Sequence, residues 1–167
     1  MAFSEPHIAP GCGIDAEFVN LGVPVYLRRI EKRDRPWLVD LCKRRYSHIY
    51  DAGTADAWLL NVVLPNPIQF YATRTANAFQ VTNLTTTPWT PQKFKADIVF
   101  ICADRTSPEG KSVWETLSLL RDSIQWARDR RASAWQFETE TEHDLKPLMQ
   151  KLGAKEITPR YRLTLEG

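Results

Sequence analysis

The chain has 167 residues, 43% of them hydrophobic and 25% charged, a composition typical of one soluble globular domain. Its 22 Lys+Arg against 20 Asp+Glu leave a formal charge of +2, which argues against nucleic acid or an anionic membrane as the main partner. The three cysteines form no CxxC pair, which favours a reduced, intracellular protein. We expect no membrane span because no apolar run approaches ~20 residues, and no secretion signal because the first twenty residues lack a basic start followed by an apolar stretch.

Residues 1–22 contain several prolines and glycines and only scattered apolar residues. We expect an irregular N-terminal arm outside the fold, either a loose terminus or a docking arm for a partner. The folded domain is expected to span residues 23–167.

The first regular elements are a strand and two helices. The strand is predicted over residues 25–30 and ends in charged residues. Asp34 is expected to cap the first helix, and three residues at i, i+3 and i+4 form its buried face: Leu38, Leu41 and Cys42. A second helix is predicted from Thr54, and its inward-facing residues are Trp58, Leu59, Val62 and Val63.

Three strands are predicted next. Residues 69–75 and 79–85 are expected to pair as an antiparallel hairpin. A stiff loop follows at 87–91, where Trp89 either packs locally or forms an exposed anchor for a ligand lid or a protein partner. Residues 98–103 are apolar at every position, which predicts a strand at the sheet centre that is covered on both faces.

The longest helix is predicted over residues 111–131, with an apolar face formed by Val113, Leu117, Leu120, Ile124 and Ala127. A strand over 133–139, a short helix over 144–152 that ends at Gly153, and a last strand or strand pair over 157–165 complete the chain. The order β-α-α-β-β-β-α-β-α-β predicts an α/β (α+β) fold, a mixed sheet with a central β-α-β crossover.

That order, over residues 23–167, resembles the GCN5-related N-acetyltransferase (GNAT) family. In that family the apolar central strand leads to a phosphate-gripping turn, R/Q-x-x-G-x-G/A, at the start of the long helix, and here residues 107–112 read SPEGKS. The next strand splays away in the family, and a helix ending in Y-x-K-x-G-F precedes the last strands. Here residues 149–154 read MQKLGA.

The resemblance implies acetyl-coenzyme A (acetyl-CoA) as the cofactor. Its pantetheine arm is expected along the strand backbone at Ile101, Cys102 and Ala103. Its pyrophosphate is expected at the backbone N–H groups of the turn that begins the long helix, where the helix dipole also favours an anion. The residues of that turn are Glu109, Gly110, Lys111 and Ser112. The small Gly110 and Ser112 allow close approach, whereas the carboxylate of Glu109 weakens the anion site.

The catalytic groups implied by the resemblance are incomplete. Met149 stands in the place of the tyrosine that protonates the leaving thiolate in many family members, and a thioether cannot donate a proton. Candidate general bases are Asp97 and Asp104, at the two ends of the apolar strand, although such carboxylates commonly just terminate a strand in solvent. Tyr161 is a candidate substitute acid.

We therefore expect a catalytically degenerate GNAT-fold protein with a structural or protein-binding role. The phrases RPWL, KRRY and LGAK are similar to sequences of phage proteins of this fold, which implies a phage origin. The partners would then be other protein subunits, including virion proteins, and the protein would lie in the host cytoplasm or in the virion. The alternative is an active acetyl-CoA-dependent N-acetyltransferase that acts on an amine the sequence does not identify.

The sequence gives little support to two other kinds of site, a phosphate loop and a metal site. Residues 105–112 differ from the phosphate loop G-x-x-x-x-G-K-S/T only in their first residue, but Arg105 replaces the glycine that permits the turn and Pro108 removes an N–H. The three histidines lie far apart in sequence, which argues against a metal site.

Overall fold

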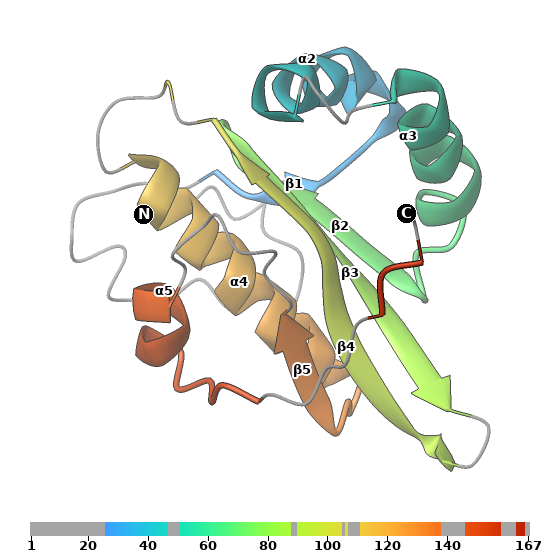
Figure 1. Cartoon of the computed structure of the whole chain (residues 1–167), viewed down its shortest axis with the longest axis vertical. Helices are drawn as coiled ribbons and strands as arrows, with labels where there is room; N and C mark the ends of the chain where they lie inside the picture. The colour runs from blue at the N-terminus through green and yellow to red at the C-terminus, as the bar shows by residue number, and fades with distance from the viewer. Residues whose placement is uncertain are drawn as a thin grey trace.

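The computed structural model describes residues 26–46, 51–87, 90–104, 106, 111–137, 146–157 and 163–165. They form a five-stranded sheet in the order β1-β2-β3-β4-β5, with helices on both faces (Figure 1). Neighbouring strands are antiparallel from β1 to β4, while β4 and β5 are parallel. The prediction of a mixed α/β fold with a β-α-β crossover is confirmed. The N-terminal arm at 1–22 lies outside the described residues.

Most elements lie within or near the predicted ranges, but β4 begins at Thr90, inside the predicted loop 87–91 and well before the predicted start at residue 98. The strands are β1 (Arg28–Arg29), β2 (Phe70–Arg74), β3 (Ala78–Thr87), β4 (Thr90–Ala103) and β5 (Ala134–Phe137). The helices are the 3-10 turn η2 (Lys32–Asp34), α2 (Arg35–Tyr46), α3 (Ala52–Trp58), the π-helical turn η3 (Leu59–Val63), α4 (Lys111–Asp129) and α5 (Lys146–Lys151).

The sheet face under α2 and η3 carries the apolar core. Alternate residues of each strand point to this face, since the side-chain period of a strand is two. The buried residues of the cluster are Ile30, Leu38, Leu41, Cys42, Leu59, Val63, Phe70, Ala72, Phe79, Val81 and Cys102. On its edge the rings of Tyr46 and Phe100 lie 5.7 Å apart, which joins the end of α2 to β4.

The opposite face, under α4, combines apolar contacts with a chain of buried polar side chains. Gln80 Nε2 donates to Thr73 Oγ1 (2.9 Å), and Thr82 Oγ1 donates to Gln80 Oε1 (2.5 Å). Thr82 Oγ1 also lies 2.6 Å from Ser123 Oγ on α4, which in turn accepts from Trp135 Nε1 on β5 (2.9 Å). This chain of hydrogen bonds is buried, so it satisfies polar groups that would otherwise be costly inside the protein.

Helix α4 therefore differs from the simple amphipathic helix that was predicted. Ser118, Asp122 and Ser123, on the side expected to face solvent, are fully buried, while Val113 is 49% exposed. The reason is that α4 packs on polar side chains of the sheet as well as on apolar ones. Among the helices described here, none has both the length and the apolarity of a membrane span.

Asp34 is not the cap of α2 that was predicted. The 3-10 turn η2 precedes the helix, and Asp34 at its end accepts from the backbone N–H of Glu31 (2.8 Å) instead. Similarly, α3 begins at Ala52, two residues before the predicted Thr54, because Asp51 accepts from the Thr54 N–H (2.9 Å) and is the actual cap.

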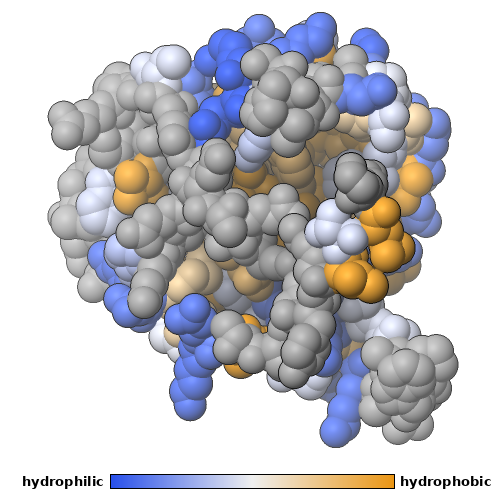
Figure 2. All heavy atoms as spheres, viewed as in Figure 1, coloured by the Kyte–Doolittle hydropathy of each residue, from blue (hydrophilic) through white to orange (hydrophobic). Residues whose placement is uncertain are grey.

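The last predicted strand, over residues 157–165, is not observed in the part of it that is described. Residues 154–157 and 163–165 have no regular secondary structure. Ile157 is 72% exposed, Leu163 82% and Leu165 86%. Figure 2 shows hydrophobic residues on the surface where segment 163–165, red in Figure 1, lies near the C-terminus.

Candidate functional site

Strand β4 pairs with β3 up to its end, but with β5 over a short stretch only. The β3 register extends to Ala103, whereas the parallel register with β5 runs from Lys95 to Ile98. Among the described residues, the edge of β4 at 99–103 therefore has no strand partner on the side of β5. Figure 1 shows β4 continuing past the end of β5 toward the start of α4.

A β-bulge lies where the pairing with β5 stops. Val81 pairs with Phe100 but Thr82 pairs with Ile98, so Val99 is the extra residue. Val99 is 44% exposed, although the sequence predicted burial on both faces, and the middle strand of the sheet is β3 rather than β4. A bulge bends its strand and increases the local twist, which helps to separate β4 from β5 here.

The three residues expected to contact the cofactor, Ile101, Cys102 and Ala103, lie in this open segment. The Cys102 side chain is 2% exposed and packs in the apolar cluster that α2 covers. A ligand at this open edge would therefore meet the strand backbone and not the Cys102 side chain. N–H and C=O groups at such an edge can pair with an extended chain as a further strand would.

The first turn of α4 follows this edge in the chain. Lys111 and Ser112 are its first two residues, and Glu109 and Gly110 lie outside the described residues. The first N–H groups of a helix have no partner within the helix and carry the positive end of its dipole. No acidic residue lies in the first turn of α4, so this helix end favours an anion.

Asp104 follows the last residue of β4, and both of its carboxylate oxygens are engaged by other side chains or backbone groups. Its Oδ1 accepts from the N–H (2.9 Å) and the Oγ1 (2.7 Å) of Thr106, and its Oδ2 lies 3.1 Å from Arg44 Nη1. The bonds from Thr106, followed by the charge of Arg44, lower the pKa of Asp104. Since a lower pKa makes a carboxylate a weaker base, this geometry does not favour Asp104 as a proton acceptor.

Asp97 has a different setting, at the point where β5 stops pairing with β4. Its Oδ2 accepts from Thr85 Oγ1 on β3 (3.1 Å), and its Oδ1 accepts from Gln136 Nε2 on β5 (3.0 Å). Asp97 thus links three strands and is half-buried. Sequence reasoning missed Thr85 and Gln136 because only the pairing of β4 with β3 and β5 brings them beside Asp97.

The helix that carries Met149 lies beside α4. The Lys151 ammonium is 5.2 Å from the centre of the Trp114 ring, which places α5 near the first turns of α4. Gly153, with φ 75°, ends the helix as predicted, and Ala154 N–H donates to the carbonyl of Met149 (3.0 Å). Tyr161 lies outside the described residues.

Within the described ranges, no group of three or more His, Cys, Asp or Glu side chains could hold a metal ion. Two of the three cysteines, Cys42 and Cys102, are described, and both are buried free thiols.

No protein-family model and no curated protein matches this sequence. Solved structures do match the fold. An acetyltransferase of Trypanosoma brucei aligns with a TM-score of 0.66 at 13% identity, over 84% of this chain and 99% of that chain. Glucosamine-6-phosphate N-acetyltransferase from Arabidopsis thaliana aligns with a TM-score of 0.68 at 9% identity, over 85% and 99%.

A third match is a Clostridium acetobutylicum protein described as a predicted acetyltransferase with acetyl-CoA. Its TM-score is 0.65 at 16% identity, over 84% of this chain and 96% of that chain. At such identities the likeness concerns the fold alone. The chain therefore has the fold of the GNAT acetyltransferases, as the sequence predicted.

Proposed function

We propose that this protein binds acetyl-CoA along the open edge of β4 and transfers its acetyl group very slowly or not at all. The observation that carries the proposal is the edge at 99–103, which has no β5 partner among the described residues and leads to the N-terminus of α4. An extended pantetheine arm can pair with such an edge, while the pyrophosphate meets the first N–H groups of the helix. The Clostridium protein, of the same fold, is described with acetyl-CoA.

The chemistry of transfer explains why we expect little turnover. An acceptor amine attacks the thioester carbonyl and loses a proton to a base, and the thiolate of coenzyme A leaves and takes up a proton. Both candidate bases are already engaged, Asp104 by Thr106 and Arg44 and Asp97 by Thr85 and Gln136, so neither carboxylate is free to accept the proton. Met149 cannot supply the proton to the thiolate, and general acid help is typically worth about 10²–10⁴ in rate.

Calorimetric titration of the full chain with acetyl-CoA tests the binding. We expect Ser112→Ala to keep most of the affinity, because the backbone N–H remains, and Ser112→Glu to weaken it by about tenfold or more through repulsion of the pyrophosphate. A carboxylate at a helix N-terminus favours the helix itself, so this variant should still fold. No heat of binding with the wild-type protein, or equal affinities of the two variants, would contradict the proposal.

Replacement of Met149 tests whether turnover is slow because the site lacks a proton donor at this position. We expect the wild-type protein to acetylate small amines far more slowly than the ~1–10³ per second that is usual for enzymes. Met149→Tyr should raise the rate if the site lacks only its acid, whereas Met149→Leu, which also cannot donate a proton, should leave it unchanged. Wild-type turnover in the usual range would show an active enzyme.

A second candidate function is a protein-binding role in a phage particle. The observation that favours it is the exposure of Leu163 and Leu165, since exposed apolar side chains that lie together mark interaction surfaces. On this proposal a phage encodes the chain, and mass spectrometry of its purified particles should detect the protein. Absence of the chain from those particles would reject it.

A further inference from the structure

Asn77, in the turn between β2 and β3, contacts two other parts of the chain. Its carbonyl accepts from the backbone N–H of Asp104 (2.7 Å), the residue that follows β4. Its own backbone N–H donates to Glu115 Oε1 (3.1 Å), and its side-chain Nδ2 donates to Glu115 Oε2 (3.0 Å) on α4. One residue of the hairpin turn therefore joins the end of β4 to α4, at the end of the sheet where α4 begins (Figure 1).

The two contacts lie close to the two parts of the proposed cofactor site. Asp104 is the residue after Ala103, where the open edge of β4 ends. Glu115 is four residues past Lys111, which is about 6 Å along the helix axis from the end of α4 that would meet the pyrophosphate. Loss of either contact would therefore let one part of the site move relative to the other.

The contact with Glu115 is buried and involves a charge. Glu115 is 6% exposed, and its carboxylate accepts from two donors of Asn77. Hydrogen bonds to a charged group are about twice as strong as neutral ones, and the low polarity of the interior strengthens them further. The turn itself is closed by a hydrogen bond from the Thr75 N–H to the Ala78 carbonyl (2.8 Å). It therefore gives α4 a fixed support.

We propose that Asn77 is a positioning residue of the acetyl-CoA site, which holds the N-terminus of α4 at the distance from the open β4 edge that one cofactor molecule needs. This inference rests on the proposed function, which places the pantetheine arm on the edge and the pyrophosphate on the helix. A ligand of two linked parts gains affinity over each part only when both parts can bind at once. Loss of the Asn77 contact should therefore weaken the binding of the whole cofactor and leave the binding of its pantetheine part unchanged.

Asn77→Asp tests this role, because it replaces the amide donor by a carboxylate that faces Glu115. Repulsion between the two carboxylates should displace the start of α4 and weaken acetyl-CoA binding about tenfold or more, as measured by calorimetric titration of the full chain. Glu115→Gln added to this variant should restore the affinity to within about threefold of the wild type, because the introduced amide can donate to the introduced carboxylate.

The same variants separate position from charge. A direct effect of the carboxylates on the pyrophosphate predicts that Glu115→Gln improves the affinity by one factor in the wild type and in Asn77→Asp. Positioning predicts a gain of about tenfold or more in Asn77→Asp and of less than about threefold in the wild type. Equal factors in the two backgrounds would overturn the role of Asn77.

Gln69→Glu is the control for added charge. It introduces a carboxylate at an exposed residue before the other end of β2 and should change the affinity by less than about twofold, since an exposed charge far from the site is screened. An effect as large as that of Asn77→Asp would also overturn the role of Asn77.

Acetyl-pantetheine, which lacks the pyrophosphate, separates positioning from a general loss of the fold. In NMR titrations its affinity should agree within about twofold between the wild type and Asn77→Asp, because it would contact the β4 edge alone. A parallel loss would show that Asn77 supports the whole fold and would overturn the proposal. No binding of acetyl-pantetheine to the wild type at millimolar concentration would show that the edge does not hold the arm, which overturns both proposals.

The titrations also distinguish failure of this inference from failure of the proposed function. If the wild type does not bind acetyl-CoA, the proposed function fails and the inference fails with it. If the wild type binds acetyl-CoA and Asn77→Asp binds it equally well, the proposed function stands and only the role of Asn77 is overturned.

Discussion

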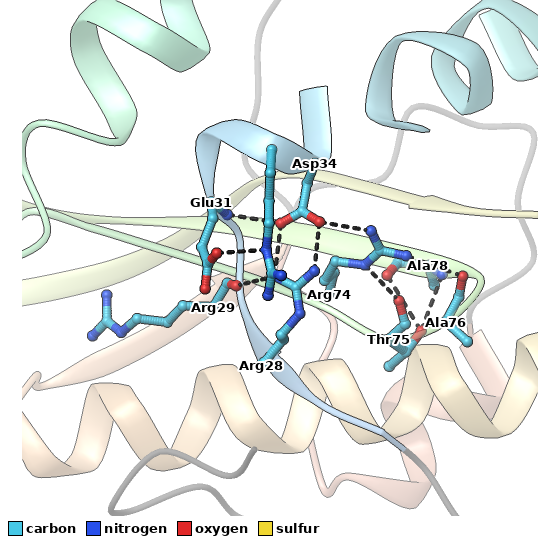
Figure 3. A network of polar contacts seen from close by, with 9 residues as sticks. Arg28, Arg29, Glu31, Asp34, Arg74, Thr75, Ala76 and Ala78 are labelled. Atoms are coloured by element: carbon cyan, nitrogen blue, oxygen red, sulfur yellow. Dashed lines mark hydrogen bonds and ion pairs between the residues drawn. The ribbon is translucent and has the colours of Figure 1, made fainter. Parts of the chain in front are cut away.

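Asp34 holds three segments of the chain together through one carboxylate. Arg28 of β1 donates to both of its oxygens (2.5 and 2.7 Å), and Arg74 at the end of β2 donates to Oδ1 (2.9 Å) (Figure 3). Arg74 also donates to the carbonyls of Thr75 and Ala76 in the hairpin turn, and its guanidinium lies 3.4 Å from the centre of the Trp37 ring. The network thus fixes the hairpin relative to the start of α2.

Asp34→Asn should destabilise the protein by about 3–5 kcal/mol, because it leaves two partly buried guanidinium groups without their anion. The measurement is the free energy of unfolding in denaturant at pH 7. Asp40→Asn is the control, since Asp40 forms an exposed pair with Arg44, and it should cost less than about 1 kcal/mol. Equal losses in the two variants would contradict a special role for Asp34.

The same carboxylate makes stability depend on pH. Burial alone would raise the pKa of Asp34, but the hydrogen bonds from Arg28, Glu31 and Arg74 lower it to about 2. A folded pKa below the unfolded one means that the contribution is complete above about pH 4 and is lost as the pH falls toward 2. Roughly 2 kcal/mol should disappear in this window in the wild type and much less in Asp34→Asn.

Ser123 and Ser118 form a matched pair on α4, because both are fully buried but only Ser123 joins the hydrogen-bond chain. Ser123→Ala should destabilise the protein by about 1–3 kcal/mol, since the Trp135 N–H would lose its acceptor. The Ser118 hydroxyl has no hydrogen-bond partner among the described residues, so Ser118→Ala should be neutral or slightly stabilising. Thermal unfolding of both variants checks the difference, and the reverse order would be inconsistent with it.

At the scale of the element, η3 shows how one wide turn changes which residues are buried. The Leu64 N–H donates to the carbonyl of Leu59 (3.0 Å), five residues back, as in a π-helix. The sequence pattern placed both Val62 and Val63 on the inner face of a regular helix. In the structure Val63 is 2% exposed, but Val62 is 40% exposed.

Substitution of the two valines tests which of them faces the core. Val63→Ala should lower the free energy of unfolding by about 2 kcal/mol, because two buried methyl groups are lost and a cavity remains. Val62→Ala should change it by less than about 0.5 kcal/mol. Denaturant unfolding of the two variants gives the comparison, and similar losses would indicate that Val62 is also in the core.

At the scale of the whole molecule, the sheet has an apolar core on one face and a mixed polar and apolar layer on the other. Leu38 of α2 and Phe79 of β3 belong to the first, whereas in the second Ser123 of α4 meets the hydrogen-bonded Thr82 and Gln80 of β3. Burial of apolar side chains provides most of the stabilisation on the α2 side. On the α4 side, hydrogen bonds between buried polar groups offset the cost of removing those groups from water. The open edge of β4, at residues 99–103, lies between these two layers and beyond Ile98, the last residue of β4 that pairs with β5.

Deletion of residues 1–22 should change the free energy of unfolding by less than about 1 kcal/mol, because their proline and glycine content argues against a regular element. Leu27→Ala in the full chain is the comparison, and it should cost about 2–5 kcal/mol since Leu27 is fully buried. A loss of ~2 kcal/mol or more on deletion, on the scale of a buried side chain, would show that the arm belongs to the core.

The sequence by itself determined the order and type of the main helices and strands from β1 to α5. The hairpin of β2 and β3, the helix after β4 and the glycine end of α5 follow from periodicity and turn residues, which act between neighbours in the chain. The GNAT fold could be inferred from that order.

The tertiary structure alone decided which distant residues meet. The bulge at Val99, the end of β5 pairing at Ile98, the bonds of Asp97 and the packing of α2 on β4 in one apolar cluster all depend on strand register and helix docking. The same holds for Asp34, whose partner Arg74 lies on another strand. Such contacts arise from packing over the whole chain, and no local pattern encodes them.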